Sequence, residues 1–193
     1  MELPSFLHEL TEDENTPSLE YAQEVFNLLE VRKVREKETI LYLGDTATKI
    51  YFVKKGILKC SIMDDSGNLH TTRFVAENDA VTAMVSYIEQ QPSNIQIDCV
   101  EDAEVLCFKY DDFQYMSKLY PGLATAFHKI MLRRYHGLLD EKARMISRDA
   151  TSRYLKFIEL YPAIAERLPL KEIASFLGIR QQSLSRLRSK IDE

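Results

Sequence analysis

The chain has 193 residues, of which 45% are hydrophobic and 28% are charged, a balance typical of a soluble globular protein. No apolar run approaches the roughly 20 residues of a bilayer-spanning helix, and the N-terminus lacks the pattern of a secretory signal. The three cysteines, Cys60, Cys99 and Cys107, never show C-x-x-C spacing, so we expect buried thiols in a reducing cytoplasm. We expect no metal site and no cofactor, because no His or Cys lies at ligand spacing.

Charge is distributed unevenly along the chain. Residues 1–112 hold 10 Lys and Arg against 22 Asp and Glu, a net charge of −12, whereas residues 113–193 hold 15 against 8, a net charge of +7. A basic segment attracts polyanions, although a solvated helical face can also be basic. The asymmetry indicates two parts, with a polyanion partner expected at the C-terminal end.

The first 30 residues show a helical period, with Ser18 as the capping residue and an apolar stripe at Leu19, Ala22, Phe26 and Leu29. From residue 31 the period changes to that of short strands separated by turn signals. Strands are predicted at 31–35, 39–43, 50–53, 57–63, 70–75, 95–100 and 104–110. So many short strands indicate a sandwich or a rolled barrel, and the pattern does not choose between them.

A helical period returns after residue 110. Asp111 or Asp112 can begin a short helix that ends near Lys118, and Pro121 lies near the start of a helix of about 25 residues. The apolar stripe of the long helix consists of Leu123, Phe127, Ile130, Met131, Leu138 and Met145. This stripe fits either a core helix lying on the barrel or the seam of a dimer. We favour the dimer seam, because residues 170–189 have the spacing of a helix-turn-helix, and paired half-sites suit proteins with that motif.

Residues 170–189 have the spacing of a helix-turn-helix. Ala174 is small where two helices would approach closest, and Gly178 can adopt the positive φ of a tight turn. Apolar residues hold the two helices together: Ile173, Leu177, Leu184 and Leu187. The polar residues left outward are the candidate DNA-binding residues, Arg180, Gln181, Gln182, Ser183, Ser185, Arg186 and Arg188. An ordinary helical hairpin is the alternative, and the Ala174–Gly178 offset with the basic, amide-rich second helix favours DNA binding.

This order of elements resembles the Crp/Fnr superfamily of bacterial transcription regulators, and the short form is most similar to members common in the Bacteroidetes. The resemblance rests on Gly44, "YFVKKG" ending at Gly56, the turn at Gly67, Asp149-x-x-x-Arg153 and "IASFLGIRQQSLSRLR". It implies an α+β fold with a double-stranded, cyclic-nucleotide-binding-like β-roll as sensor domain over 1–118. A dimerisation helix is implied over 119–147, and an all-α helix-turn-helix domain over 148–193.

The resemblance also implies partners. They are double-stranded DNA, a second copy of the chain, a small-molecule effector and RNA polymerase. A membrane is not expected as a partner. Arg186 matches an arginine that reads guanine in the family, whereas Gln181 and Gln182 replace an arginine and a glutamate, so we expect a different target sequence. Most members of the family continue past the recognition helix into a two-stranded wing. The sequence stops at Glu193 without a full wing, which we expect to weaken DNA binding.

The phosphate cassette of the family is altered in this sequence. Where nucleotide-binding members carry Gly-Glu and Arg-Ser pairs, this chain carries Thr82 with Ala83 and Ser93 with Asn94. A buried phosphate without a cation is costly, so we expect no binding of cyclic AMP or cyclic GMP in the usual way. The pocket then holds another ligand or is filled by apolar side chains, and we favour filling, by Met84, Val85, Tyr87 and Ile88.

The sequence therefore predicts a dimeric, sequence-specific DNA-binding transcription regulator. The alternative is a small-molecule or protein-interaction module whose degenerate helix-turn-helix no longer binds DNA. We do not expect an enzyme, because the four histidines are scattered and no nucleophile elbow, P-loop or H-E-x-x-H motif is present.

Overall fold

The computed structural model describes residues 19–146 and 149–191. The first described helix is α2 (Leu19–Asn27), which confirms this part of the predicted N-terminal helix. Val25 of α2 is 1% exposed and anchors the helix to the core of the domain that follows. The predicted cap, Ser18, lies outside the described residues.

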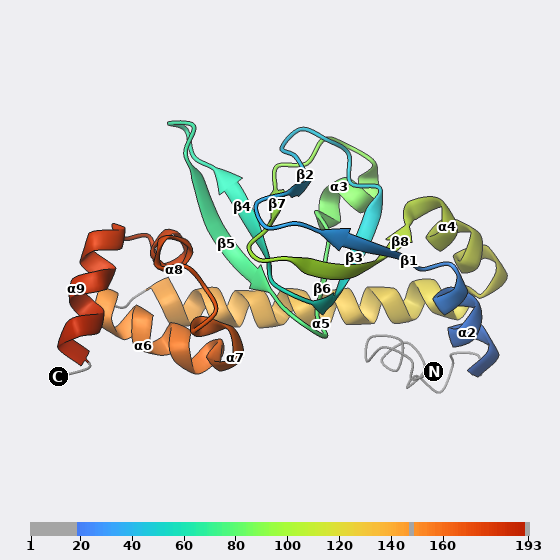
Figure 1. Ribbon diagram of the computed structural model, residues 1–193. Coiled ribbons are helices and arrows are strands. Elements are labelled where there is room, and N and C mark those ends of the chain that lie inside the picture. The colour runs from blue at the N-terminus through green and yellow to red at the C-terminus, as the bar shows by residue number, and fades with distance from the viewer. Residues whose placement is uncertain (1–18, 147–148, 192–193) are drawn as a thin grey trace.

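The strands that follow form two antiparallel sheets (Figure 1). One sheet has the order β1-β8-β3-β6 and the other the order β2-β7-β4-β5. The strands are β1 (Glu30–Val34), β2 (Thr39–Leu41), β3 (Lys49–Lys55), β4 (Leu58–Met63), β5 (Leu69–Val75), β6 (Ala80–Val81), β7 (Gln96–Cys99) and β8 (Ala103–Lys109). Inward side chains of both sheets, such as Val53, Leu58, Ile97 and Val105, form one buried core between them. This is the predicted β-roll.

The helices of the second half lie along one side of this roll and at its two ends (Figure 1). They are α4 (Tyr110–Leu119), α5 (Pro121–Ile146), α6 (Ala150–Leu160), α7 (Pro162–Ala165), α8 (Leu170–Leu177) and α9 (Gln181–Ile191). Figure 1 shows α5 running along one side of the roll, from the end near α2 and α4 to the C-terminal helices. Among the helices that the structure describes, none combines the length and the apolar character needed to cross a bilayer.

The C-terminal helices share a hydrophobic core with the roll. Phe74 of β5 packs against Phe157 of α6 and Phe176 of α8, with ring centroids 6.1 and 5.5 Å apart. Ile57 and Val100 of the roll join the same buried cluster. The roll therefore supplies part of the core of the C-terminal helices, and the two parts are packed together rather than merely tethered.

Ion pairs reinforce this contact between the roll and the C-terminal helices. Arg167, after α7, pairs with Glu77 (Nη2–Oε1 2.8 Å) and with Glu101, both in loops of the roll. Lys59 of β4 pairs with Glu172 of α8 at 2.6 Å, and both of these side chains are less than one-fifth exposed. The position of α8 is thus fixed by apolar and charged contacts together.

The seam predicted on α5 needs correction at its N-terminal end. Leu123 is 1% exposed and belongs to the core of the roll, while Phe127 and Met131 pack partly against the same core. Leu123 was therefore wrongly assigned to a dimer seam, because the roll itself covers that face of the helix. The remaining predicted seam side chains, Ile130, Leu138 and Met145, lie outside those that the structure describes.

A different apolar stripe of α5 is exposed. Leu132, Tyr135 and Leu139 are 48%, 56% and 46% exposed and lie at spacings of three and four residues, so they share one helix face. Sequence periodicity pointed to the neighbouring stripe because both stripes are apolar, and only the position of the roll decides which one is covered.

Candidate functional site

The C-terminal motif forms two helices joined by a tight turn, as its spacing predicts. Gly178 ends α8 in the left-handed conformation, with φ +65°. The amide of Ile179 donates to the carbonyl of Ala174 at 3.0 Å, a bond typical of a glycine-terminated helix. Ala174 is 2% exposed within the buried cluster that holds the two helices together, and Gly178 has the positive φ that the sequence indicates.

Buried leucine and isoleucine side chains determine which face of α9 is presented to solvent. Leu184 is fully buried, and Ile173 and Leu177 of α8 are 1% and 3% exposed. Leu187 is partly buried against the same cluster. Because α9 turns by about 100° per residue, anchoring Leu184 and Leu187 leaves the polar residues around them on the outside.

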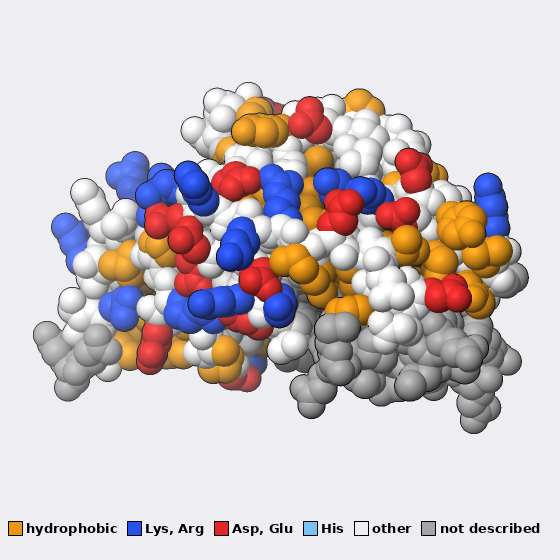
Figure 2. Space-filling view, turned by 45° about the vertical axis from the view of Figure 1, so that its right-hand side comes forward, with side chains coloured by type: hydrophobic (Ala, Val, Ile, Leu, Met, Phe, Trp, Pro, Cys, Tyr) orange, Lys and Arg blue, Asp and Glu red, His pale blue; other side chains and the backbone are white. Residues whose placement is uncertain are grey.

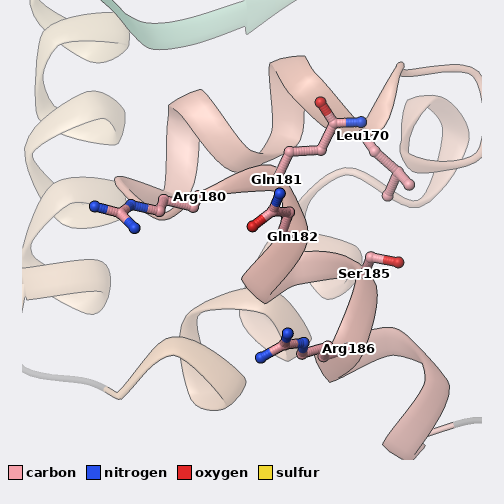
Figure 3. A pocket seen from close by; sticks show the side chains of 6 residues that line it. All are labelled: Leu170, Arg180, Gln181, Gln182, Ser185 and Arg186. Atoms are coloured by element: carbon pink, nitrogen blue, oxygen red, sulfur yellow. The ribbon is translucent and has the colours of Figure 1, made fainter.

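Six of the seven predicted DNA-binding residues are exposed, and Arg188 is half-buried. Five of them line an open concave surface that begins at Leu170 of α8 and continues along the first turns of α9 (Figure 3). These five are Arg180, Gln181, Gln182, Ser185 and Arg186. Figure 3 shows Arg180 and Arg186 extending to the same side of α9. Ser183 is exposed but does not line this surface, which we call the α9 surface.

The chemistry of the α9 surface fits a nucleic acid. Guanidinium groups bind guanine edges or phosphates in a bidentate manner, and glutamine amides match adenine. The N-terminus of α9 also presents backbone N–H groups, which favour a phosphate. On the face drawn in Figure 2, Lys and Arg side chains extend over the region of the C-terminal helices, with Asp and Glu among them. The surface can contact both backbone and bases of a duplex.

A second candidate site is a cavity of about 220 Å³ between the roll and α5. Its walls are formed by strands β3 to β6, by the start of α3 (Met84–Glu89) with the segment before it, by the segment before β7, and by α5. The lining residues are Ile50, Cys60, Thr72, Arg73, Ala80, Val81, Thr82, Met84, Ile95, Met131 and Tyr135. Most of these side chains are apolar, and we call this space the roll cavity.

The structure separates the five predicted pocket residues. Thr82 and Met84 line the roll cavity, whereas Ala83 is 2% exposed and packed in the core of the roll. Ser93 is buried, and its hydroxyl donates to the carbonyl of Ile95 at 2.8 Å. Asn94 is exposed to solvent. The cassette positions therefore do not converge on one ligand site in this chain.

The expectation that apolar side chains fill the cavity is wrong. Of the four residues proposed as fillers, Met84 alone lines the cavity. Tyr87 is 1% exposed but packs against Tyr110, with ring centroids 5.3 Å apart. Val85 and Ile88 are 59% and 57% exposed. Beyond Met84, no side chain of the short helix α3 lines the cavity, which stays open.

Sequence reasoning missed a cation in this cavity. Arg73 of β5 lines it, and its Nη2 lies 2.5 Å from Oδ2 of Asp79. The cause is a β-bulge: Cys60 pairs with Arg73 but Ser61 pairs with Thr71, so Thr72 is an extra residue. The bulge brings the adjacent Thr72 and Arg73 to the same cavity, which simple strand alternation would forbid. No sequence signal reveals this bulge.

The cysteines are buried, as expected. Desolvation raises the pKa of the Cys60 thiol to about 11, so this group stays protonated in the cavity wall. In the described part of the chain, no three His, Cys, Asp or Glu side chains gather in a way that would hold a metal ion.

Comparisons with known proteins agree with this architecture. The family model of the cyclic nucleotide-binding domain matches residues 31–120. The transcriptional regulatory protein btr of Bordetella pertussis is 28% identical over 184 residues, covering 88% of this chain and 75% of that protein.

Solved structures show the same fold. FixK2 from Bradyrhizobium japonicum superposes with a TM-score of 0.73 at 17% identity, covering 85% of this chain and 84% of that chain. A regulator of the Crp/Fnr family from Eubacterium rectale superposes with a TM-score of 0.69 at 16% identity, covering 91% and 84%. The relatives are transcription regulators rather than enzymes. Residues 31–120, which form most of the β-roll, thus match the cyclic nucleotide-binding domain, and the chain is similar to transcription regulators that include a member of the Crp/Fnr family.

Proposed function

We propose that this protein is a cytoplasmic transcription regulator that binds specific DNA sequences as a dimer through the α9 surface. The observation that carries the proposal is the burial of Leu184, which fixes α9 so that two arginines and two glutamines face outward together. Residues 1–118 would act as sensor, 119–147 as dimerisation helix and 148–193 as DNA-binding domain. RNA polymerase stays a predicted partner.

The dimer is proposed to form through the exposed stripe of α5, Leu132, Tyr135 and Leu139. An uninterrupted apolar stripe on a long helix is what a second helix of the same kind would cover. Two copies related by a two-fold axis would present two α9 surfaces, which suits a DNA site with inverted half-sites.

We also propose that cyclic AMP is not the effector. The cassette positions supply neither carboxylate nor guanidinium, and the hydroxyl of Thr82 already donates to the carbonyl of Lys49 at 2.9 Å. A cation, Arg73, does line the cavity, although not at a cassette position. Its guanidinium is already paired with the carboxylate of Asp79. A ribose would thus meet few polar partners in a mostly apolar space.

A gel-shift titration with duplex DNA at rising salt tests the proposal. We expect affinity to fall steeply with salt, since phosphate contacts release counterions. Arg186→Ala should lose about 1–3 kcal/mol of discrimination at one base position in each half-site. Arg35→Ala, in the turn after β1, is the matched control and should bind like the wild type.

The two predicted functions differ in this experiment. A protein that shifts no duplex at low salt would contradict DNA binding and favour the interaction module with a degenerate helix-turn-helix. An Arg186→Ala protein that keeps full sequence preference would contradict the role assigned to that side chain.

A further inference from the structure

The roll cavity combines an apolar lining with a guanidinium group. Its volume of about 220 Å³ exceeds that of engineered apolar cavities of about 150 Å³ that bind benzene. It is smaller than the roughly 300 Å³ at which pockets for drug-sized ligands begin. The cavity therefore suits a single ring or a medium-length alkyl chain.

The polar groups around the cavity are mostly committed to other partners. The hydroxyl of Thr72 donates to the carbonyl of Cys60 at 3.2 Å, and that of Thr82 to the carbonyl of Lys49. Burial keeps the Cys60 thiol protonated. A ligand rich in hydroxyl or amide groups would leave those groups without hydrogen bonds, at a cost in affinity. An apolar ligand body carries no such cost.

Arg73 is the group that would orient such a ligand. Its contact with Asp79 joins Nη2 to Oδ2, while Oδ1 of Asp79 accepts from the amide of Ala80 at 2.7 Å. The Arg73 and Asp79 side chains are 27% and 31% exposed, so the pair is not sealed from the solvent. A planar guanidinium has several N–H donors, and a ligand carboxylate can bind it beside or in place of Asp79.

We propose that the roll cavity binds a small, predominantly apolar carboxylate. Its hydrocarbon part would lie against Ile50, Ile95 and Met131, and its carboxylate would bind Arg73. Binding itself is independent of DNA. The regulatory consequence rests on the proposed function: Met131 and Tyr135 belong to α5, so the ligand would contact the helix that leads to the C-terminal helices.

Isothermal titration calorimetry on the full chain, without DNA, tests the inference. The probes are sodium octanoate and sodium phenylacetate, each compared with its neutral counterpart, 1-octanol or 2-phenylethanol. We expect one saturable site per chain and binding of at least one carboxylate about tenfold tighter than its alcohol, the effect of a charge-assisted hydrogen bond. The better carboxylate identifies a chain or a ring as the ligand body.

Variants assign the site. Arg73→Met should weaken carboxylate binding about tenfold and leave alcohol binding unchanged. Asp79→Asn removes the carboxylate that competes for Arg73 and should tighten the binding of carboxylate ligands. Arg35→Met, an exposed arginine outside the cavity, is the matched control and should match the wild type. Ile95→Phe narrows the cavity and should weaken both ligand classes, which keeps the test valid if Arg73→Met fails to fold.

Several results would overturn the inference. They are the absence of saturable heat with either carboxylate, alcohols that bind as tightly as the acids, or cyclic AMP displacing octanoate with higher affinity. Because these titrations contain no DNA, a protein that binds octanoate but no duplex would contradict the proposed function alone. A protein that binds duplex but no carboxylate would contradict this inference alone.

Discussion

Gly56, between β3 and β4, shows how one residue fixes the junction of the two sheets. Its φ is +96°, and its amide donates to Oε1 of Glu77 at 2.9 Å. A Cβ at this position would lie 2.7 Å from Cα and Cβ of Ala103 and from the carbonyl oxygen of Asp102. The backbone conformation and the lack of space therefore both demand glycine.

We predict that Gly56→Ala lowers the free energy of unfolding by about 2–5 kcal/mol. The left-handed conformation costs an alanine about 1–2 kcal/mol, and overpacking adds about 1–3 kcal/mol. Urea unfolding followed by circular dichroism measures the change. The control is Gly67→Ala, where φ is +82° but no atom lies within 4 Å of a new Cβ, so only the conformational cost applies. Equal losses in the two variants would contradict the steric argument.

Residue roles were predictable where local geometry sets them. Gly178 and Ala174 follow from helix-turn-helix spacing, and the outward face of α9 follows from Leu184 and Leu187. The role of Arg73 was not predictable, because it depends on a bulge that sequence alternation does not record. Arginine is a residue type expected at an anion site, but its position at the cavity depends on how β4 and β5 pair, which the sequence alone does not reveal.

At the scale of elements, a charged contact joins the roll to the C-terminal helices. Arg167 pairs with Glu77 and Glu101, and each of these three side chains is about one-third exposed. The guanidinium of Arg167 lowers the pKa of Glu77 to about 2, below its ordinary value of 4.5. Docking of the C-terminal helices thus stabilises the charged form of Glu77, in addition to the hydrogen bond from the Gly56 amide within the roll.

This contact predicts a specific acid sensitivity. Because the pKa of Glu77 is lower in the folded state, its contribution to stability is present above pH 4.5 and is lost as the pH falls toward 2. Glu77→Gln should cost about 1 kcal/mol at neutral pH and flatten the decline of stability in that acid range. Thermal unfolding between pH 2 and pH 7 measures both effects.

The control is Glu166→Gln, which alters an exposed glutamate beside Arg167 and should keep the wild-type pH dependence. If Glu77→Gln loses stability on acidification as steeply as the wild type, the contact between Arg167 and Glu77 does not stabilise the docked arrangement.

Elements with strong periodicity were predictable. All seven predicted strands are present within a few residues, and the long helix begins at Pro121 as expected. Strand β6 and helix α3 were missed, because they have two and six residues and short elements leave no period to detect. The face of α5 covered by the roll was not predictable, since both of its stripes are apolar and long-range packing chooses between them.

At the scale of the whole molecule, α5 connects every proposed function. Its inner face packs on the roll, Met131 and Tyr135 line the roll cavity, and its exposed stripe is the proposed dimer seam. Figure 1 shows the same helix leading from the roll toward the C-terminal helices. A ligand in the cavity would thus contact the helix that carries the proposed seam and that leads toward the C-terminal helices.

We predict that Leu139→Glu separates the proposed dimer into monomers, because it places a charge in an apolar seam that would be desolvated on association. Sedimentation velocity measures the change. Leu155→Glu is the matched control, since Leu155 of α6 is similarly exposed, at 49% against 46% for Leu139, but lies off the seam. A Leu139→Glu protein that sediments like the wild-type dimer would place the interface elsewhere.

Two copies of α9, held in symmetric register, are proposed to read base edges of duplex DNA. Selection of bound sequences from a random duplex pool, with wild type and Arg186→Ala in parallel, tests it most directly. We expect an enriched motif with two-fold symmetry, and loss of preference at one position in each half-site for Arg186→Ala. A pool that shows no enrichment, or a motif without symmetry, would contradict it.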